Sequence, residues 1–180
     1  DELDRLLEEV KRSLEDVEEK LKKLEEEVKR VNDELRKRLT RLLREVERSL
    51  KRVEDLIRNG EPKEDILREH ERSVKEVLKE VRKVVTEVEE AHKRVMREVE
   101  RVLREHEETV KRVLEDVTRR NGEKLEEVRE RLKESLDRLR KRVEDLKRRL
   151  RESLESVRKL VEDLERALRK SLEELRERVR

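Results

Sequence analysis

The sequence predicts an all-α fold: a straight, essentially unsupercoiled up-down-up three-helix bundle with helices of about 57 residues each. Three observations predict it. Apolar residues recur at the period of an α-helix along the whole chain. Helix-breaking residues occur in only two short segments, and those segments divide the 180 residues into three nearly equal parts. The composition, 58% charged and 31% apolar, is otherwise typical of disorder, but strict apolar spacing argues against a disordered chain.

The first helix is expected over residues 2–58. Its apolar stripe runs from Leu3 to Ile57 and covers 54 residues in 15 steps, or 3.6 residues per step. A heptad repeat has a period of 3.5 and produces a left-handed supercoil. A period of 3.6 therefore predicts a helix that need not supercoil, roughly 85 Å long at the usual rise per residue.

Two turns are expected, at residues 59–61 and 120–122. Gly60 and Gly122 each follow an asparagine, and glycine in the left-handed conformation commonly closes a helix. Pro62 suits the first turn of the next helix. The second and third helices are therefore expected over 62–119 and 123–180. Linkers this short fold each helix back on its predecessor, which predicts a single domain over residues 1–180.

The third helix repeats the pattern of the first. Its stripe runs from Leu125 to Val179, again 54 residues in 15 steps. A Ser-Leu pair recurs every 18 positions, with serines at Ser135, Ser153 and Ser171, and this interval makes five helical turns. In the second helix, residues 67–74 recur in similar form at 103–110.

With these repeats, a Leu/Val/Ile core, an almost wholly charged surface and paired Asn-Gly turns, the whole chain resembles computationally designed, parametrically generated helical bundles with buried hydrogen-bond networks. Spectrin-like repeats also have three helices, but typically with heptads, aromatic residues and a more varied surface. The resemblance implies an artificial structural scaffold with no natural biochemical activity. The long helices and numerous aliphatic side chains predict a hyperstable monomer.

Uncharged polar residues are rare and predict three buried layers. His70 and His106 fall at the centre of the second helix's apolar arc, with neighbouring hydroxyls roughly 55° to the side. Folding the helices back brings polar residues from all three to the same height, in layers about 27 Å apart. The predicted layers are Ser13, His106, Thr109 and Ser135; Asn32, His92 and Ser153; and Ser49, His70, Ser73 and Ser171.

We interpret these layers as structural. A neutral imidazole has one donor and one acceptor, which hydroxyls on two neighbouring helices can satisfy. A shift in register would leave buried polar atoms against leucine, at a cost in free energy. The alternative hypothesis is an interaction or pH-responsive module, in which the helices bind partner chains, assemble further or open in acid through the buried histidines.

Other functions have little support in the sequence. Catalysis by a Ser/His pair requires an orienting carboxylate and oxyanion donors, and no carboxylate falls on the apolar arc, so no enzyme is expected. The histidines are 22 and 14 residues apart, roughly 33 and 21 Å along one helix, and cannot share a metal ion. Without cysteine, thiolate metal sites and disulfides are excluded.

No cofactor or partner is expected either. The net charge is +2 and Phe, Trp and Tyr are absent, so nothing can stack on nucleic-acid bases or anchor the chain at a membrane surface. The sequence has no recognisable targeting signal and no apolar run long enough to span a bilayer. We expect a soluble protein whose localisation is undetermined.

Overall fold

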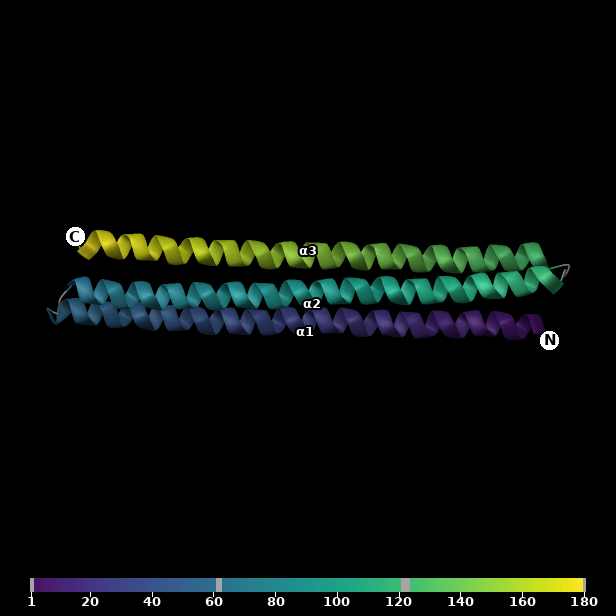
Figure 1. Cartoon of the computed structure of the whole chain (residues 1–180), viewed down its shortest axis with the longest axis horizontal. Helices are drawn as coiled ribbons and strands as arrows, with labels where there is room; N and C mark the ends of the chain where they lie inside the picture. Colours follow the sequence, from purple (N-terminus) through teal and green to yellow (C-terminus); the bar gives the residue numbers. More distant parts are fainter. Residues whose placement is uncertain (1, 61–62, 121–123, 180) are drawn as a thin grey trace. The chain divides into compact units, whose positions relative to one another are not determined.

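In the computed structural model, residues 2–60, 63–120 and 124–179 are described. They form three helices: α1 (Glu2–Arg58), α2 (Lys63–Arg120) and α3 (Leu125–Val179) (Figure 1). The all-α prediction is confirmed for this part of the chain, and α1 has its predicted bounds. The second helix ends one residue later than predicted. Residues 62 and 123, where the second and third helices are predicted to start, lie outside the described residues. So do residues 61, 121 and 122 of the predicted turns.

The end of α1 shows why the chain turns at Gly60. The Gly60 N–H donates to the Ile57 carbonyl at 3.2 Å, and the Asn59 N–H donates to the Asp55 carbonyl at 3.1 Å. Gly60 has a φ of 76°, in the left-handed region that a side chain disfavours. The glycine therefore closes α1 as its position in the sequence predicts.

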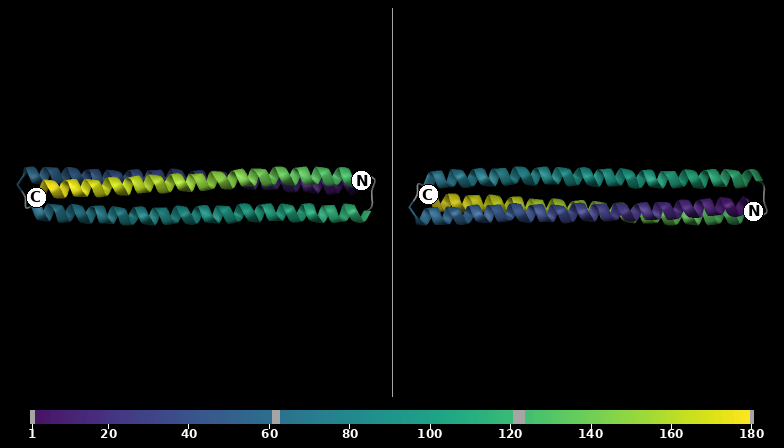
Figure 2. Two further views of the ribbon diagram at one scale, coloured as in Figure 1. Left: turned by 90° about the horizontal axis from the view of Figure 1, so that it is seen from above. Right: turned by 90° about the horizontal axis from the view of Figure 1, so that it is seen from below.

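The contacts group the chain into two units, each with a segment of all three helices; the colours of Figure 2 locate these segments along the ribbons. Unit 1 is Asp1–Lys29 with His92–Glu152, and unit 2 is Arg30–Ala91 with Ser153–Arg180. In both, α1 packs with α2 and α2 packs with α3, as an up-down-up bundle requires. The single domain over 1–180 and the absence of supercoiling stay predictions.

Aliphatic residues from all three helices build the core of each unit. In unit 1, Leu21, Val99 and Val143 are fully buried together. In unit 2, Leu35, Val81 and Val161 belong to one cluster. Among the described residues, the buried apolar side chains of α2 are all valine except Ile66. Valine is short and rigid at χ1, so α2 presents a narrow stripe to its neighbours.

Four ion pairs report the register of α2 against α3. Each joins a basic residue of α3 to a glutamate of α2, and the step from one pair to the next is equally long in both helices and opposite in direction. The pairs are Arg140–Glu107 and Lys147–Glu100 in unit 1, and Arg158–Glu89 and Arg176–Glu71 in unit 2. Exposed pairs of this kind add little stability, but they establish that α2 and α3 keep one antiparallel register inside each unit.

Candidate functional site

Unit 2 contains a buried histidine bonded to a serine of another helix. His70, on α2, has no solvent exposure, and its Nδ1 is 3.0 Å from the Ser49 Oγ of α1. The stripe position of His70 directs the imidazole into the core, and the fold-back at Gly60 brings α1 to it. The pairing of Ser49 with His70 follows the predicted antiparallel register.

Unit 1 contains the equivalent contact. His106 also has no solvent exposure, and its Nδ1 lies 2.8 Å from the Ser13 Oγ. His106 follows His70 by 36 residues, and Ser49 follows Ser13 by 36 residues, which is ten helical turns. The two contacts therefore repeat the same α1–α2 geometry in separate units.

Unlike Nδ1, the second ring nitrogen of each of these two histidines makes no hydrogen bond to the described residues. The Nε2 atoms of His70 and His106 have no hydrogen-bond partner among the described residues, and neither has the buried Ser135 Oγ. Ser135 lies on α3 between Leu132, which clusters with Val110, and Leu139, which clusters with Val102. Ser135 therefore lies near the height of His106, without a hydrogen bond between them, and a layer that contains both stays a prediction.

The third pair of polar residues joins α1 to α3. The Asn32 Nδ2 donates to the Ser153 Oγ at 2.5 Å inside unit 2, while the Asn32 Oδ1 is buried without a partner in the described chain. His92 belongs to unit 1, is 3% exposed and takes part in a polar interaction of its own. A layer that includes Asn32, His92 and Ser153 together stays a prediction.

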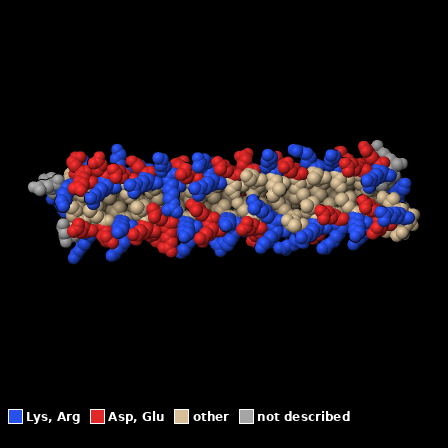
Figure 3. Space-filling view, turned by 180° about the vertical axis from the view of Figure 1, so that it is seen from behind, with Lys and Arg blue, Asp and Glu red and all other residues tan. Residues whose placement is uncertain are grey.

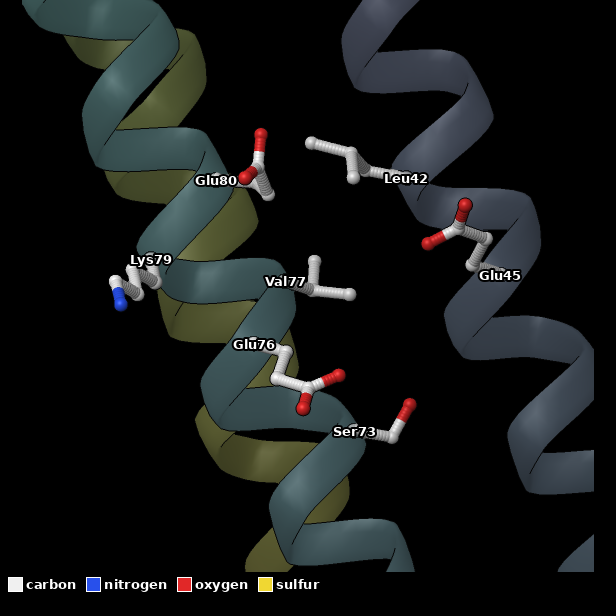
Figure 4. A pocket seen from close by; sticks show the side chains of 7 residues that line it. All are labelled: Leu42, Glu45, Ser73, Glu76, Val77, Lys79 and Glu80. Carbon is white, nitrogen blue, oxygen red and sulfur yellow. The ribbon is translucent and has the colours of Figure 1, made fainter.

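Three further predicted residues are half-buried. The Thr109 hydroxyl donates to the Glu105 carbonyl of its own helix at 3.1 Å, a bond that threonine commonly makes one turn back. Ser73 lines an open groove between α1 and α2 of unit 2 (Figure 4). Ser171, on α3, is half-buried. No hydrogen bond to His70 or His106 from any of these three residues is observed.

Burial determines the acid–base behaviour of the two bonded histidines. Desolvation lowers the pKa of His70 and the pKa of His106, because an imidazolium is poorly solvated in an aliphatic core. The neighbouring Glu71 and Glu107 act in the opposite direction. Each glutamate also accepts a hydrogen bond from α3, from Arg176 at 2.9 Å and from Arg140 at 3.3 Å, which reduces its effect on the imidazole.

The open groove beside Ser73 has an acidic lining. It has a volume of about 350 Å³, and its lining includes Glu45, Glu76 and Glu80 together with Lys79, whose side chain is directed away from α1 in Figure 4. Within the described ranges, no group of three or more His, Cys, Asp or Glu side chains is placed to hold a metal ion. In the same part of the chain, no helix is long and apolar enough to cross a membrane.

Sequence reasoning missed two exposed leucines. Leu43 is 40% exposed and Leu160 is 45% exposed. The available signal was the repeat of five helical turns: the residues 18 positions earlier are Glu25 and Arg142, so each leucine occupies a surface position that is charged elsewhere.

Comparison with known proteins finds a likeness in structure but none in sequence family. No known family model matches the chain, and no curated protein matches it. A solved structure described as "Computationally designed three helix bundle" is similar with 18% sequence identity over 98% of this chain and 80% of that chain, at a TM-score of 0.45. The fold and the histidine contacts described above rest on the residues of this chain alone.

Proposed function

We propose that the protein is an artificial structural scaffold whose helix register is specified by buried polar contacts. The observation that carries this proposal is the repetition of one Ser–His contact, Ser13–His106 and Ser49–His70, at equivalent positions of the two units. A contact needed for chemistry has no reason to recur every ten turns along an aliphatic core. A contact that fixes register does.

The buried polar contacts distinguish the native register of the helices from registers shifted by one helical turn. Leucine and valine layers are interchangeable, so a slip of one helical turn changes the apolar packing little. The same slip places His106 opposite Val10 or Val17 instead of Ser13. A buried donor or acceptor left unpaired costs about 1–3 kcal/mol, and two such sites favour one register over its neighbours.

The same contacts argue against catalysis. A histidine that activates a serine is itself oriented by a carboxylate in known triads. In this chain the Nδ1 atoms of His70 and His106 bond serine, and their Nε2 atoms have no partner among the described residues. No carboxylate therefore bonds either imidazole, which supports a scaffold without enzymatic activity.

The experiment that tests the scaffold proposal removes both contacts. We expect the quadruple variant Ser13→Ala, Ser49→Ala, His70→Leu, His106→Leu to stay helical and at least as resistant to denaturant, because apolar replacements of a buried polar pair are often neutral or stabilising. It should lose uniqueness, seen as more than one set of amide NMR resonances. Thr118→Ala, at an exposed hydroxyl that bonds only its own helix, is the control. One sharp set of resonances from the quadruple variant would reject the proposal.

A second candidate function, an acid-responsive bundle, has its own supporting observation. His70 and His106 are both fully buried and both have a lowered pKa. The charged groups around His70 are Glu71 on its own helix, Arg176 on α3, and the Arg52–Glu69 pair between α1 and α2. Acid would place an imidazolium in an aliphatic core, and a denaturant midpoint unchanged between pH 7.5 and pH 4 would exclude this function.

A further inference from the structure

The two exposed leucines lie along the same seam, where α1 meets α3 in unit 2. Leu43 is 11 residues from both Asn32 and Glu54, so the three share a helix face. Asn32 bonds Ser153 of α3, and Glu54 pairs with Arg178 of α3 at 4.0 Å. Leu160 precedes Arg178 by five helical turns, which places it on the α3 face that meets α1.

Three other exposed residues of this seam are also uncharged. We define the neutral patch as five exposed residues of this seam: Thr40, Leu43, Ser156, Leu160 and Ala167. In Figure 3 the uncharged (tan) surface between the charged residues of α1 and those of α3 is wider in the right half of the view, where the residues of unit 2 are drawn. On a chain that is 58% charged, five neighbouring uncharged surface positions are a marked departure.

The repeat of five helical turns provides an internal control for the patch. The residue 18 positions before each member of the patch is charged; in order these residues are Lys22, Glu25, Arg138, Arg142 and Arg149. They belong to unit 1, where Arg142 pairs with Glu18 across the same seam at 3.9 Å. Unit 1 therefore has a charged seam where unit 2 has a neutral one, although aliphatic residues form the core of both.

The core of unit 2 does not use the exposed leucines. The half-buried residues that pack against its main cluster include Leu42, Leu50 and Leu164, but neither Leu43 nor Leu160. The exposed part of each side chain, 40% for Leu43 and 45% for Leu160, is in contact with water and would be removed from it only by a further surface.

We propose that the neutral patch binds the neutral patch of a second copy of this chain in a weak two-fold dimer. In a two-fold interface a patch meets itself, so the protruding Leu43 and Leu160 of one copy can lie on the small Ser156 and Ala167 of the other. The charge pattern agrees with a copy as the partner. Exposed Arg44 and Glu47 flank the patch on α1, and exposed Lys159 and Asp163 flank it on α3, so each rim carries both signs.

The size of the patch determines the expected affinity. It extends over about 17 Å of α3, from Ser156 to Ala167, and a stable interface buries roughly 800 Å² per partner. Two leucines and three small side chains provide less than that. The dimer should therefore form with a dissociation constant on the order of 0.1–1 mM, and the chain should be monomeric at micromolar concentration. This inference goes beyond the scaffold proposal and does not depend on the buried histidines.

Sedimentation equilibrium between 10 µM and 1 mM tests the dimer. The unaltered chain should rise in apparent mass from 22.1 kDa toward twice that value, and 1 M NaCl should not prevent the rise. The variant Leu43→Glu, Leu160→Arg introduces the charges found 18 positions earlier, in unit 1, and should stay at 22.1 kDa. Ala167→Arg, a single change, should weaken association at least tenfold.

A matched control places the same two charges outside the patch. Thr86→Glu, Thr118→Arg changes two exposed positions of α2 and should associate as the unaltered chain does. Circular dichroism confirms that each variant is folded. A constant 22.1 kDa for the unaltered chain up to 1 mM, or equal association of the patch variant and the unaltered chain, would overturn the proposal; the latter outcome assigns the interface to another surface.

Discussion

The two units share a core pattern and differ in how their polar residues are used. Both bury one Ser–His contact between α1 and α2, at 2.8 Å in unit 1 and 3.0 Å in unit 2. Only unit 1 buries a serine of α3, Ser135, that has no partner in the described chain. Unit 1 also has a charged α1–α3 seam, and unit 2 has the neutral patch. Both units thus keep an aliphatic core and a Ser–His contact, while the residues of the α1–α3 seam differ.

The largest effects are expected from cavities in the two cores. Leu21 of unit 1 and Leu35 of unit 2 are 0% and 2% exposed. Leu21→Ala and Leu35→Ala should each lower the free energy of unfolding by about 2–5 kcal/mol, and amide hydrogen exchange should accelerate mainly in the unit that carries the substitution. Equal acceleration in both units would mean that they unfold as one.

The next largest effects concern the Ser–His contacts. Ser13→Ala and Ser49→Ala each leave a fully buried imidazole nitrogen without its partner, so each should cost about 1–3 kcal/mol of unfolding free energy. The two costs should be similar because the two contacts have the same geometry. Denaturant titration measures both, and a cost near zero in one unit alone would show that the contacts are not equivalent.

A smaller effect is expected from pH. The folded-state pKa values of His70 and His106 are lowered by burial, so the unfolded state binds more protons. Stability should be full above the unfolded histidine pKa of about 6.5 and should fall as the pH drops from there toward the folded values. Glu71 and Glu107 oppose part of this effect.

A double variant isolates the histidine contribution to that pH dependence. His70→Gln, His106→Gln retains all carboxylates but has no group at these two sites that titrates near neutrality. Its denaturant midpoint should change less between pH 7.5 and pH 5 than that of the unaltered chain. If the two proteins have the same pH dependence, the change belongs to other groups.

The smallest effect should come from Ser135. Its Oγ is buried without a partner among the described residues, so Ser135→Ala removes an unpaired hydroxyl and should be neutral or slightly stabilising. Ser13→Ala, in the same unit, is the matched comparison. A loss above about 1 kcal/mol from Ser135→Ala would indicate that the hydroxyl has a bonding partner in solution.

The sequence predicts the helices, and it predicts that Ser49 and His70 lie at the same height, because both follow from regular spacing. Once Gly60 closes α1, the antiparallel register follows from the short turn. Which hydroxyl bonds which histidine nitrogen does not follow from spacing. The hydrogen-bond partners of the hydroxyls at the edge of the apolar arc could not be predicted from the sequence. Thr109 lies near His106 in the sequence, yet its hydroxyl donates to a carbonyl of its own helix. The choice between these two acceptors depends on the rotation of the threonine side chain, which the spacing of residues does not determine.

The neutral patch could have been found from the sequence but was not. Leu43 and Leu160 lie outside the core stripe, so the stripe alone does not identify them. Comparing each position with the one five helical turns earlier identifies Leu43 against Glu25 and Leu160 against Arg142. Whether a leucine beside the core stripe is covered or exposed depends on the neighbouring helix, which the structure supplies.

One buried imidazole contact in each unit also determines how this protein can be observed. Without Phe, Trp or Tyr, the chain has no intrinsic fluorescence and almost no absorbance at the usual near-ultraviolet wavelength. The ring protons of the three histidines are therefore natural NMR reporters: His70 lies in unit 2, and His92 and His106 lie in unit 1. A titration or unfolding experiment that resolves these signals follows the two units separately without any added label.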